Sequence, residues 1–178
     1  MPTGKENRIP YVRNSDPDNV NEAVPPYRPS DLGTKSIIDG VQRQKVQLDT
    51  GATSATPVGA QAAGMLAYWK DRVAGIVTTD QRFAPQNIQG VAGVFTCAVT
   101  PGNQTFIKNG RTRNVSVLGV GTSWVATDQV VSDTLANNTA KGARVAAGTA
   151  PTSLLIGYAT GPAVAGVVPV DLELPDYD

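Results

Sequence analysis

From Met65 onward, short apolar or alternating runs are separated by Gly, Pro, Asn and Asp residues. Short runs rich in Val, Ile, Thr and aromatic residues predict β-strands. Turn sequences such as Thr100-Pro101-Gly102-Asn103 divide the runs at short intervals, which is typical of an antiparallel sandwich or barrel. Strands are expected at Met65–Trp69, Val73–Thr78, Val91–Val99, Gln104–Lys108, Arg113–Leu118, Asp128–Ser132, Ala143–Ala146, Leu154–Ala159 and Val167–Leu174.

The first 62 residues have a different pattern, because their few apolar residues are spaced singly among prolines. Residues before a proline prefer extended geometry, and scattered apolar groups cannot build a core. We therefore predict an extended arm that becomes ordered on the surface of a partner. Its prolines are Pro2, Pro10, Pro17, Pro25, Pro26, Pro29 and Pro57, and its expected partner contacts are Ile9, Tyr11, Val12, Tyr27, Arg28 and Leu32.

Two segments near the end of the arm have patterns of their own. Between Ser36 and Val46, the spacing of Ile37, Ile38 and Val41 allows one or two helical turns. The segment from Asp49 to Ala63 is small and polar, as expected of a hinge. The predicted organisation is an arm and hinge over residues 1–62, followed by a compact antiparallel β-sandwich or barrel, jelly-roll-like, over residues 63–178.

Composition narrows the function classes. The 178 residues carry 15 Lys+Arg and 15 Asp+Glu, so no bulk charge favours nucleic acid or an anionic membrane. With no histidine and with Cys97 as the single cysteine, the chain lacks the usual parts of a zinc site, a disulfide or a Ser-His-Asp triad. No apolar run is long enough for a signal peptide or a membrane span. We expect a soluble, non-secreted, non-enzymatic protein with no metal, cofactor or small-molecule substrate.

One motif competes with this interpretation. Asp49-Thr50-Gly51-Ala52 resembles the Asp-Thr-Gly-Ala motif of retroviral-type aspartic proteases, in which two aspartates share a proton and activate water. The motif consists of common residues, and no Gly-rich flap hairpin follows it at a convincing place. A turn within the hinge is the preferred interpretation, and the protease remains an alternative.

Basic residues gather around one predicted turn. Lys108, Arg111 and Arg113 bracket Asn109-Gly110, where they form either a solvated hairpin tip or a contact with an acidic partner. In the last predicted strand, Asp171 and Glu173 alternate with apolar residues, so they are expected on its solvent side.

The sequence also predicts where the two tryptophans and the single cysteine lie. Trp69 is expected in the core, and the position of Trp124 is left open between a core and an interface. Cys97 alternates with Phe95 and Val99, so we expect it to be buried and inert.

The stretches VAGVFTCAVTPGNQTFIKNGRTRNVSVL (91–118) and AGTAPTSLLIGYATGPAVAGVVPVDLELP (147–175) resemble the head decoration, or cement, proteins of tailed bacteriophages. The resemblance lies in the strand and turn around Thr100-Pro101-Gly102, the turn at Gly110-Arg111 and the closing VPVDLELP strand. It implies a virion protein made in the host cytoplasm, which binds the major capsid protein on the outer capsid surface and stabilises the shell, commonly as a homotrimer. A tail or fibre attachment module is the second alternative.

Overall fold

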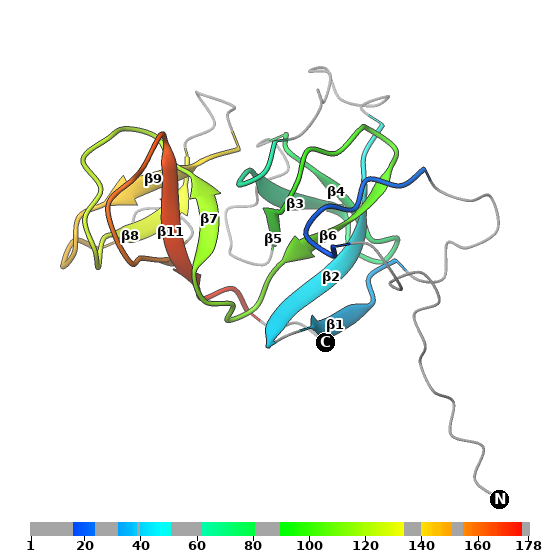
Figure 1. Ribbon diagram of the computed structural model, residues 1–178, viewed down its shortest axis with the longest axis horizontal. Helices are drawn as coiled ribbons and strands as arrows, with labels where there is room; N and C mark the ends of the chain where they lie inside the picture. The colour runs from blue at the N-terminus through cyan, green and yellow to red at the C-terminus, as the bar shows by residue number, and fades with distance from the viewer. Residues whose placement is uncertain are drawn as a thin grey trace, which may run out of the picture.

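The computed structural model of the protein describes residues 16–23, 32–38, 40–50, 62–80, 90–133, 140–150 and 155–175. These residues form strands, turns and loops, without an α-helix among them. Two β lobes lie side by side, with strands β1–β6 in one and β7–β11 in the other (Figure 1). We call residues 16–110 the barrel lobe and residues 111–175 the C-terminal lobe.

The barrel lobe is a closed barrel of five strands with one additional edge strand. Its sheet has the order β1-β2-β4-β3-β5-β6, and a further pairing between β2 and β6 closes it. The β2–β4 pair is parallel and the other pairs are antiparallel. The strands are β1 (Lys35–Ile38), β2 (Val41–Leu48), β3 (Leu66–Asp71), β4 (Ile76–Thr78), β5 (Val91–Phe95) and β6 (Gln104–Lys108).

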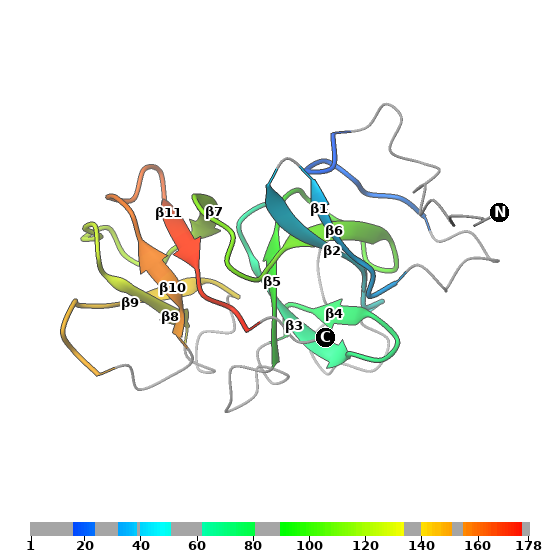
Figure 2. The same ribbon diagram turned by 90° about the horizontal axis from the view of Figure 1, so that it is seen from below.

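The C-terminal lobe is a curled sheet of five antiparallel strands in the order β7-β11-β10-β8-β9. A single bridge between Gly119 and Gly142 brings the end of β7 to the start of β9, so the sheet nearly closes on itself. Figure 2 shows this lobe from below, beside the barrel lobe. The strands are β7 (Val115–Leu118), β8 (Gln129–Ser132), β9 (Gly142–Val145), β10 (Leu155–Ala159) and β11 (Val167–Leu172).

Strand β5 and the first half of β3, Leu66–Tyr68, are buried on both faces because they separate two cores. Successive side chains of a strand point to opposite faces. Ala67 of β3 therefore points into the barrel, whereas its neighbours Leu66 and Tyr68 point toward the C-terminal lobe. The barrel core contains the buried residues Val46, Leu48, Ala67, Val77, Ala92, Phe95, Cys97, Val99 and Ile107.

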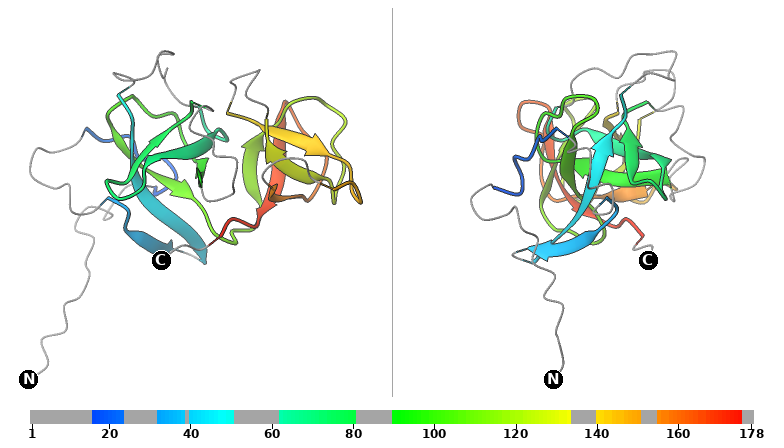
Figure 3. Two further views of the ribbon diagram at one scale, coloured as in Figure 1. Left: turned by 180° about the vertical axis from the view of Figure 1, so that it is seen from behind. Right: turned by 90° about the vertical axis from the view of Figure 1, so that its right-hand side faces the viewer.

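The second core joins the two lobes. It combines Leu66, Tyr68, Val91 and Val94 of the barrel lobe with apolar residues of the C-terminal lobe. The Tyr68 hydroxyl lies 2.8 Å from the Ser132 hydroxyl, a buried hydrogen bond between the lobes. The members from the C-terminal lobe and its connection to the barrel are Val115, Val117, Trp124, Val130, Ala140, Ile156, Ala159, Val168, Val170, Leu172 and Leu174. We call this shared region the seam; Figure 3 shows the lobes on either side of it from behind.

The predicted all-β class and the predicted barrel are confirmed. Each expected strand from Met65 onward overlaps one of the strands β3–β11. Trp124 is a core residue at 2% exposure, Trp69 packs half-buried against the barrel core, and Cys97 is buried. Val73 was expected to begin a strand but lies in the turn before β4, where it is fully exposed.

The interpretation of residues 1–62 as an arm without a sheet is wrong for residues 35–48. These residues form β1 and β2, and β2 pairs with three other strands, so no helical turn lies between Ser36 and Val46. Val46 and Leu48 are fully buried in the barrel core, but the preceding residue on their face is Gln44, so the apolar alternation of β2 is short. Arg43 is buried on the opposite face, where it pairs with Asp18. Of the predicted hinge, residues 51–61 lie outside the described residues.

In the described part of the chain, no helix has the length and apolar character required to cross a membrane.

Candidate partner-binding site

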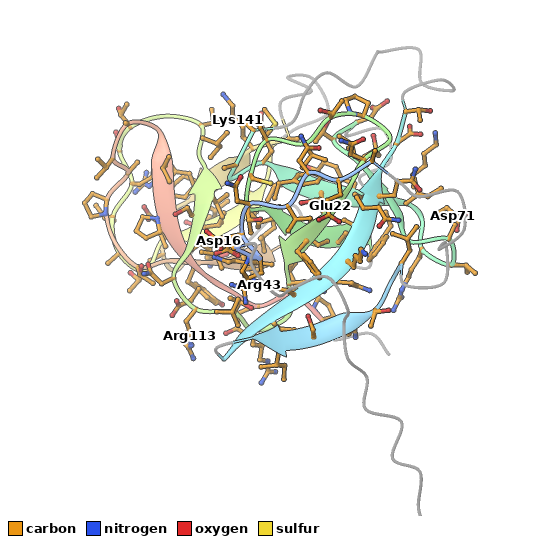
Figure 4. The ribbon with its side chains drawn as sticks, turned by 45° about the vertical axis from the view of Figure 1, so that its right-hand side comes forward. Asp16, Glu22, Arg43, Asp71, Arg113 and Lys141 are labelled. Atoms are coloured by element: carbon orange, nitrogen blue, oxygen red, sulfur yellow. The ribbon has the colours of Figure 1, made fainter. Side chains whose placement is uncertain are left out.

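Residues 16–23 form a segment, here called the strap, that lies on the barrel lobe and consists of a turn at 16–19 followed by a short run that ends in a bridge at Glu22. Strand β6 pairs with β5 only near its end, through Ile107 and Lys108, which leaves its backbone open at Gln104. Glu22 fills this opening: its N–H donates to the Gln104 carbonyl at 3.0 Å, and the Gln104 N–H donates back at 2.7 Å. Figure 4 shows Arg43 beside the segment that carries Asp16 and Glu22.

The middle of the strap covers the single thiol of the protein. Val20 is 6% exposed, and its carbonyl accepts a hydrogen bond from Cys97 Sγ at 3.3 Å. The Asn21 side chain accepts hydrogen bonds from the Thr100 N–H at 3.1 Å and from Asn103 Nδ2 at 2.8 Å. An apolar plug and a set of directional hydrogen bonds therefore fix the register of the strap.

The first part of the strap carries a carboxylate between two cations. Asp18 Oδ1 lies 3.0 Å from Arg43 Nε, and Asp18 Oδ2 lies 2.8 Å from Lys108 Nζ. Burial would raise the pKa of Asp18, but the hydrogen bonds from Lys108 and Arg43 outweigh it and hold the pKa below its ordinary value. Arg43 is only 5% exposed, so the carboxylate of the strap serves as a counter-ion to a buried guanidinium.

The residues predicted to contact a partner belong either to the arm or to the hairpin tip, and most of the arm residues are not described. Ile9, Tyr11, Val12, Tyr27 and Arg28 lie outside the described residues. Leu32 is half-buried and packs at the turn between β3 and β4, where a Cβ on Gly75 would lie 2.8 Å from Leu32 Cβ.

The three basic residues of the predicted hairpin tip all lie near acidic residues of the same chain. Lys108 pairs with Asp18, Arg111 lies 3.7 Å from Glu173, and Arg113 lies 2.6 Å from Asp171. Two hydrogen bonds lower the pKa of Asp171: the larger effect comes from the N–H of Asn114 and the next from the Arg113 side chain. Burial opposes them with a smaller effect. These pairings link the turn after β6 to the strap and to the end of the C-terminal lobe.

Asp49, the first residue of the protease-like motif, forms an ion pair with Lys70 at 2.7 Å. Its N–H donates to the Val77 carbonyl at 2.8 Å, which fixes it at the end of β2 beside β4. A carboxylate paired with an ammonium group favours a structural role over a proton-sharing dyad. Gly51 and the residues that follow it in the motif lie outside the described residues.

A second exposed feature lies on the C-terminal lobe, where residues 119–127 and 160–166 form a tip without a charged side chain. The Gly119 N–H donates to the Gly166 carbonyl at 2.9 Å, so the two loops are neighbours. Trp124 is buried beneath them, and its Nε1 donates to the Val120 carbonyl at 3.2 Å. We call this region the charge-free tip; its exposed apolar residues are Val120 (41%), Val125 (54%) and Val164 (72%).

Sequence reasoning missed the strap contacts and the charge-free tip. Asp18 and Arg43 are far apart in sequence, and neither belongs to a local motif that would pair them. The absence of charge from 119–127 is visible in the sequence, but the exposure of Val120 and Val125 depends on how the loops fold over Trp124. Among the described residues, no group of three or more His, Cys, Asp or Glu side chains is placed to hold a metal ion.

No model of a known protein family matches this chain, and no curated protein matches it. Among solved structures, the protein is similar to the N base of head fiber gp8.5 in bacteriophage phi29. The two chains share 14% sequence identity with a TM-score of 0.47, and the alignment covers 76% of this chain and 97% of that chain.

Proposed function

We propose that the protein is a non-enzymatic structural protein of a tailed-phage virion. It binds the major capsid protein on the outer surface of the head and stabilises the shell by bridging capsid subunits, as a homotrimer. The observation that supports this most is the strap, because it fixes the point on the barrel lobe from which residues 1–15 begin. The resemblance of residues 91–118 and 147–175 to head decoration proteins supplies the class of partner.

An arm that begins at a fixed point suits the bridging of subunits. Separated weak contacts joined by a short tether reinforce one another, because each bound contact raises the effective concentration of the next. Binding energy that is lost when two capsid subunits separate adds to the stability of the closed shell. Ile9, Tyr11 and Val12 are the contacts expected of the arm, while the folded lobes supply the second attachment.

Carboxylates in the strap and the two lobes support a structural role. Asp18, Asp49 and Asp128 each form an ion pair with a cation of the same chain. Burial would raise the pKa of Asp128, but hydrogen bonds from Arg144 and from the Val125 and Ala147 N–H groups hold it below its ordinary value. A catalytic carboxyl group that must gain and lose a proton near neutral pH needs the opposite shift.

The test uses phage heads that lack a bound decoration protein. The full chain is expected to sediment with heads and to raise the temperature at which they release DNA. A variant without residues 1–15 should lose at least tenfold in affinity, and Ile9→Ala combined with Tyr11→Ala should show an intermediate loss. Circular dichroism verifies that the truncated body remains folded.

Two results would contradict the proposal. One is a full chain that does not bind heads at any tested concentration. The other is peptide cleavage by the purified protein that disappears in Asp49→Asn, which would support the aspartic-protease alternative.

A fibre attachment module is the second candidate, and the charge-free tip is the observation that favours it. Exposed valines on loops held from below by Trp124 form a preorganised apolar surface. If Val120→Ser and Val164→Ser leave head binding unchanged but abolish binding of a further virion component, the attachment role gains support.

A further inference from the structure

We propose that residues 176–178, Asp-Tyr-Asp, dock into a hollow at one end of the barrel and tie the end of the C-terminal lobe to the barrel lobe. These three residues lie outside the described residues, and the inference does not depend on capsid binding. We call the hollow the barrel mouth. Its lining includes Lys35, Gln44, Trp69, Arg72, Asn109 and Pro175.

The barrel mouth lies at the end of the barrel where β6 ends. Gln44 is paired with Ile107, whose side chain is in the barrel core, so Gln44 lies on the inner face of its strand. Asn109 directly follows β6, and its Nδ2 donates to Gln44 Oε1 at 2.8 Å. Trp69 packs against the barrel core from β3. Two amides and an indole therefore line this end of the barrel.

One buried polar atom of the barrel mouth lacks a hydrogen bond. Asn109 is 6% exposed, and within the described part of the chain its Oδ1 is buried without a partner. A buried acceptor that stays unpaired costs free energy. The mouth therefore favours an occupant that carries a hydrogen-bond donor.

The charge of the lining is positive. Lys35 and Arg72 line the mouth, and no Asp or Glu of the described residues lines it with them. Both cations also have interactions of their own in the folded chain, so neither requires a new partner. The sign of their charge nevertheless favours an acidic occupant over a basic one.

The route of the chain after β11 leads to the barrel mouth. The Leu172 N–H donates to the Thr112 carbonyl at 2.9 Å. The Leu174 N–H donates to the Gly110 carbonyl at 3.2 Å. These bonds guide the chain along the connection between the lobes toward the barrel lobe (Figure 1), where Pro175 lines the mouth. Residue 176 follows at a distance of one Cα step, about 3.8 Å.

Residues 176–178 match the barrel mouth in chemistry. Asp176 and Asp178 carry the charge that the two cations favour, and the Tyr177 hydroxyl is a donor for Asn109 Oδ1. The Tyr177 ring is also suited to pack on Trp69. Residues 81–89 lead to the mouth at Val91 as well, but they include Arg82 and no acidic residue. Docking of residues 176–178 joins the lobes at a second place besides the seam.

The two tryptophans of the chain provide a direct test. In a nitrogen–proton correlation spectrum of the full chain, they give two indole N–H signals, which Trp69→Phe assigns. Asp176→Asn, Tyr177→Ser and Asp178→Asn are combined in one variant. We expect the Trp69 signal to shift and the Trp124 signal to stay, because Trp124 is buried in the other lobe. The control, Asp16→Asn with Glu22→Gln, removes the same amount of charge from exposed positions of the strap and should leave both signals in place.

Two further variants separate the hydroxyl from the charges. Tyr177→Phe keeps the ring and should shift the side-chain amide signals of Asn109. Arg72→Gln and Asp178→Asn form a double-mutant cycle in urea unfolding, in which the double variant should lose less stability than the sum of the single variants. The proposal is overturned if the triple variant leaves the Trp69 signal unmoved, or if the control shifts it equally. Unchanged Asn109 signals in Tyr177→Phe would likewise refute the placement of the hydroxyl, and strict additivity would refute the pairing of charges.

Discussion

The two lobes have similar strand numbers but depend on each other unequally. The barrel core consists only of residues from the barrel lobe, whereas the core of the C-terminal lobe is completed by Leu66, Tyr68, Val91 and Val94 of the barrel lobe. Closure differs as well. A five-residue ladder between β2 and β6 closes the barrel, but only the Gly119–Gly142 bridge closes the C-terminal sheet. The barrel lobe therefore acts as the foundation on which the C-terminal lobe folds.

The largest expected effects come from matched cavities in the two cores. Trp124→Ala in the C-terminal lobe and Phe95→Ala in the barrel should each lower the free energy of unfolding by about 3–5 kcal/mol. In native-state hydrogen exchange, Trp124→Ala should reduce protection mainly in β7–β11, whereas Phe95→Ala should reduce it in both lobes. Equal loss of protection in both lobes for both variants would contradict the unequal dependence.

A smaller loss is expected from the ion pair inside the C-terminal lobe. Asp128 is buried, pairs with Arg144 and accepts the Val125 N–H at 2.8 Å. Asp128→Asn weakens charge-assisted hydrogen bonds, and about 2–3 kcal/mol of stability should be lost. Arg144 is partly exposed and remains hydrated, which keeps the loss below that of a fully buried orphan charge. Urea unfolding measures the change. Arg144→Gln leaves the buried Asp128 carboxylate without its cation and should lose at least as much stability as Asp128→Asn; a clearly smaller loss would show that the pair does not stabilise the lobe.

The hydrogen bond across the seam should contribute less. Tyr68→Phe removes the hydroxyl that lies 2.8 Å from Ser132, at a cost of about 1–2 kcal/mol. Ser132→Ala should cost a similar amount, and the double variant less than the sum, since both changes break one interaction. Strict additivity in this double-mutant cycle would show that the hydroxyls do not couple the lobes.

The smallest effect concerns acid and the strap. The pKa of Asp18 is lower in the folded protein than its ordinary value of 3.8. Its contribution to stability is therefore complete above that value and is lost as the pH falls from about 4 through the lowered native pKa. Cys97 lies under Val20, so its labelling rate, divided by that of a free thiol at the same pH, should rise over this range; the ratio removes the general slowing of thiol reactions in acid. In Asp18→Asn the labelling should already be faster at pH 7 and depend less on pH, and an unchanged profile would contradict the role of Asp18.

The strands β3–β11 were predictable because alternation and turn residues act over a few positions. The strands β1 and β2 were not, since only Val46 and Leu48 alternate on the barrel face of β2. The buried Arg43 lies on the opposite face, and its partner Asp18 lies outside the local sequence. The roles of Lys108 and Arg113 depend on the same kind of distant pairing. The sequence revealed that these cations surround one turn, but only the three-dimensional arrangement shows which carboxylates they meet.

Gly64 joins the two lobes at the seam through backbone hydrogen bonds. Its N–H donates to the Phe95 carbonyl in the barrel lobe, and its carbonyl accepts the Leu118 N–H of the C-terminal lobe, both at 2.8 Å. It has a φ of +84°, and a Cβ there would lie 3.0 Å from the Leu118 nitrogen. One lobe cannot swivel against the other without breaking these bonds. When the barrel lobe is attached to a surface, the direction of the charge-free tip relative to that surface is therefore fixed as well.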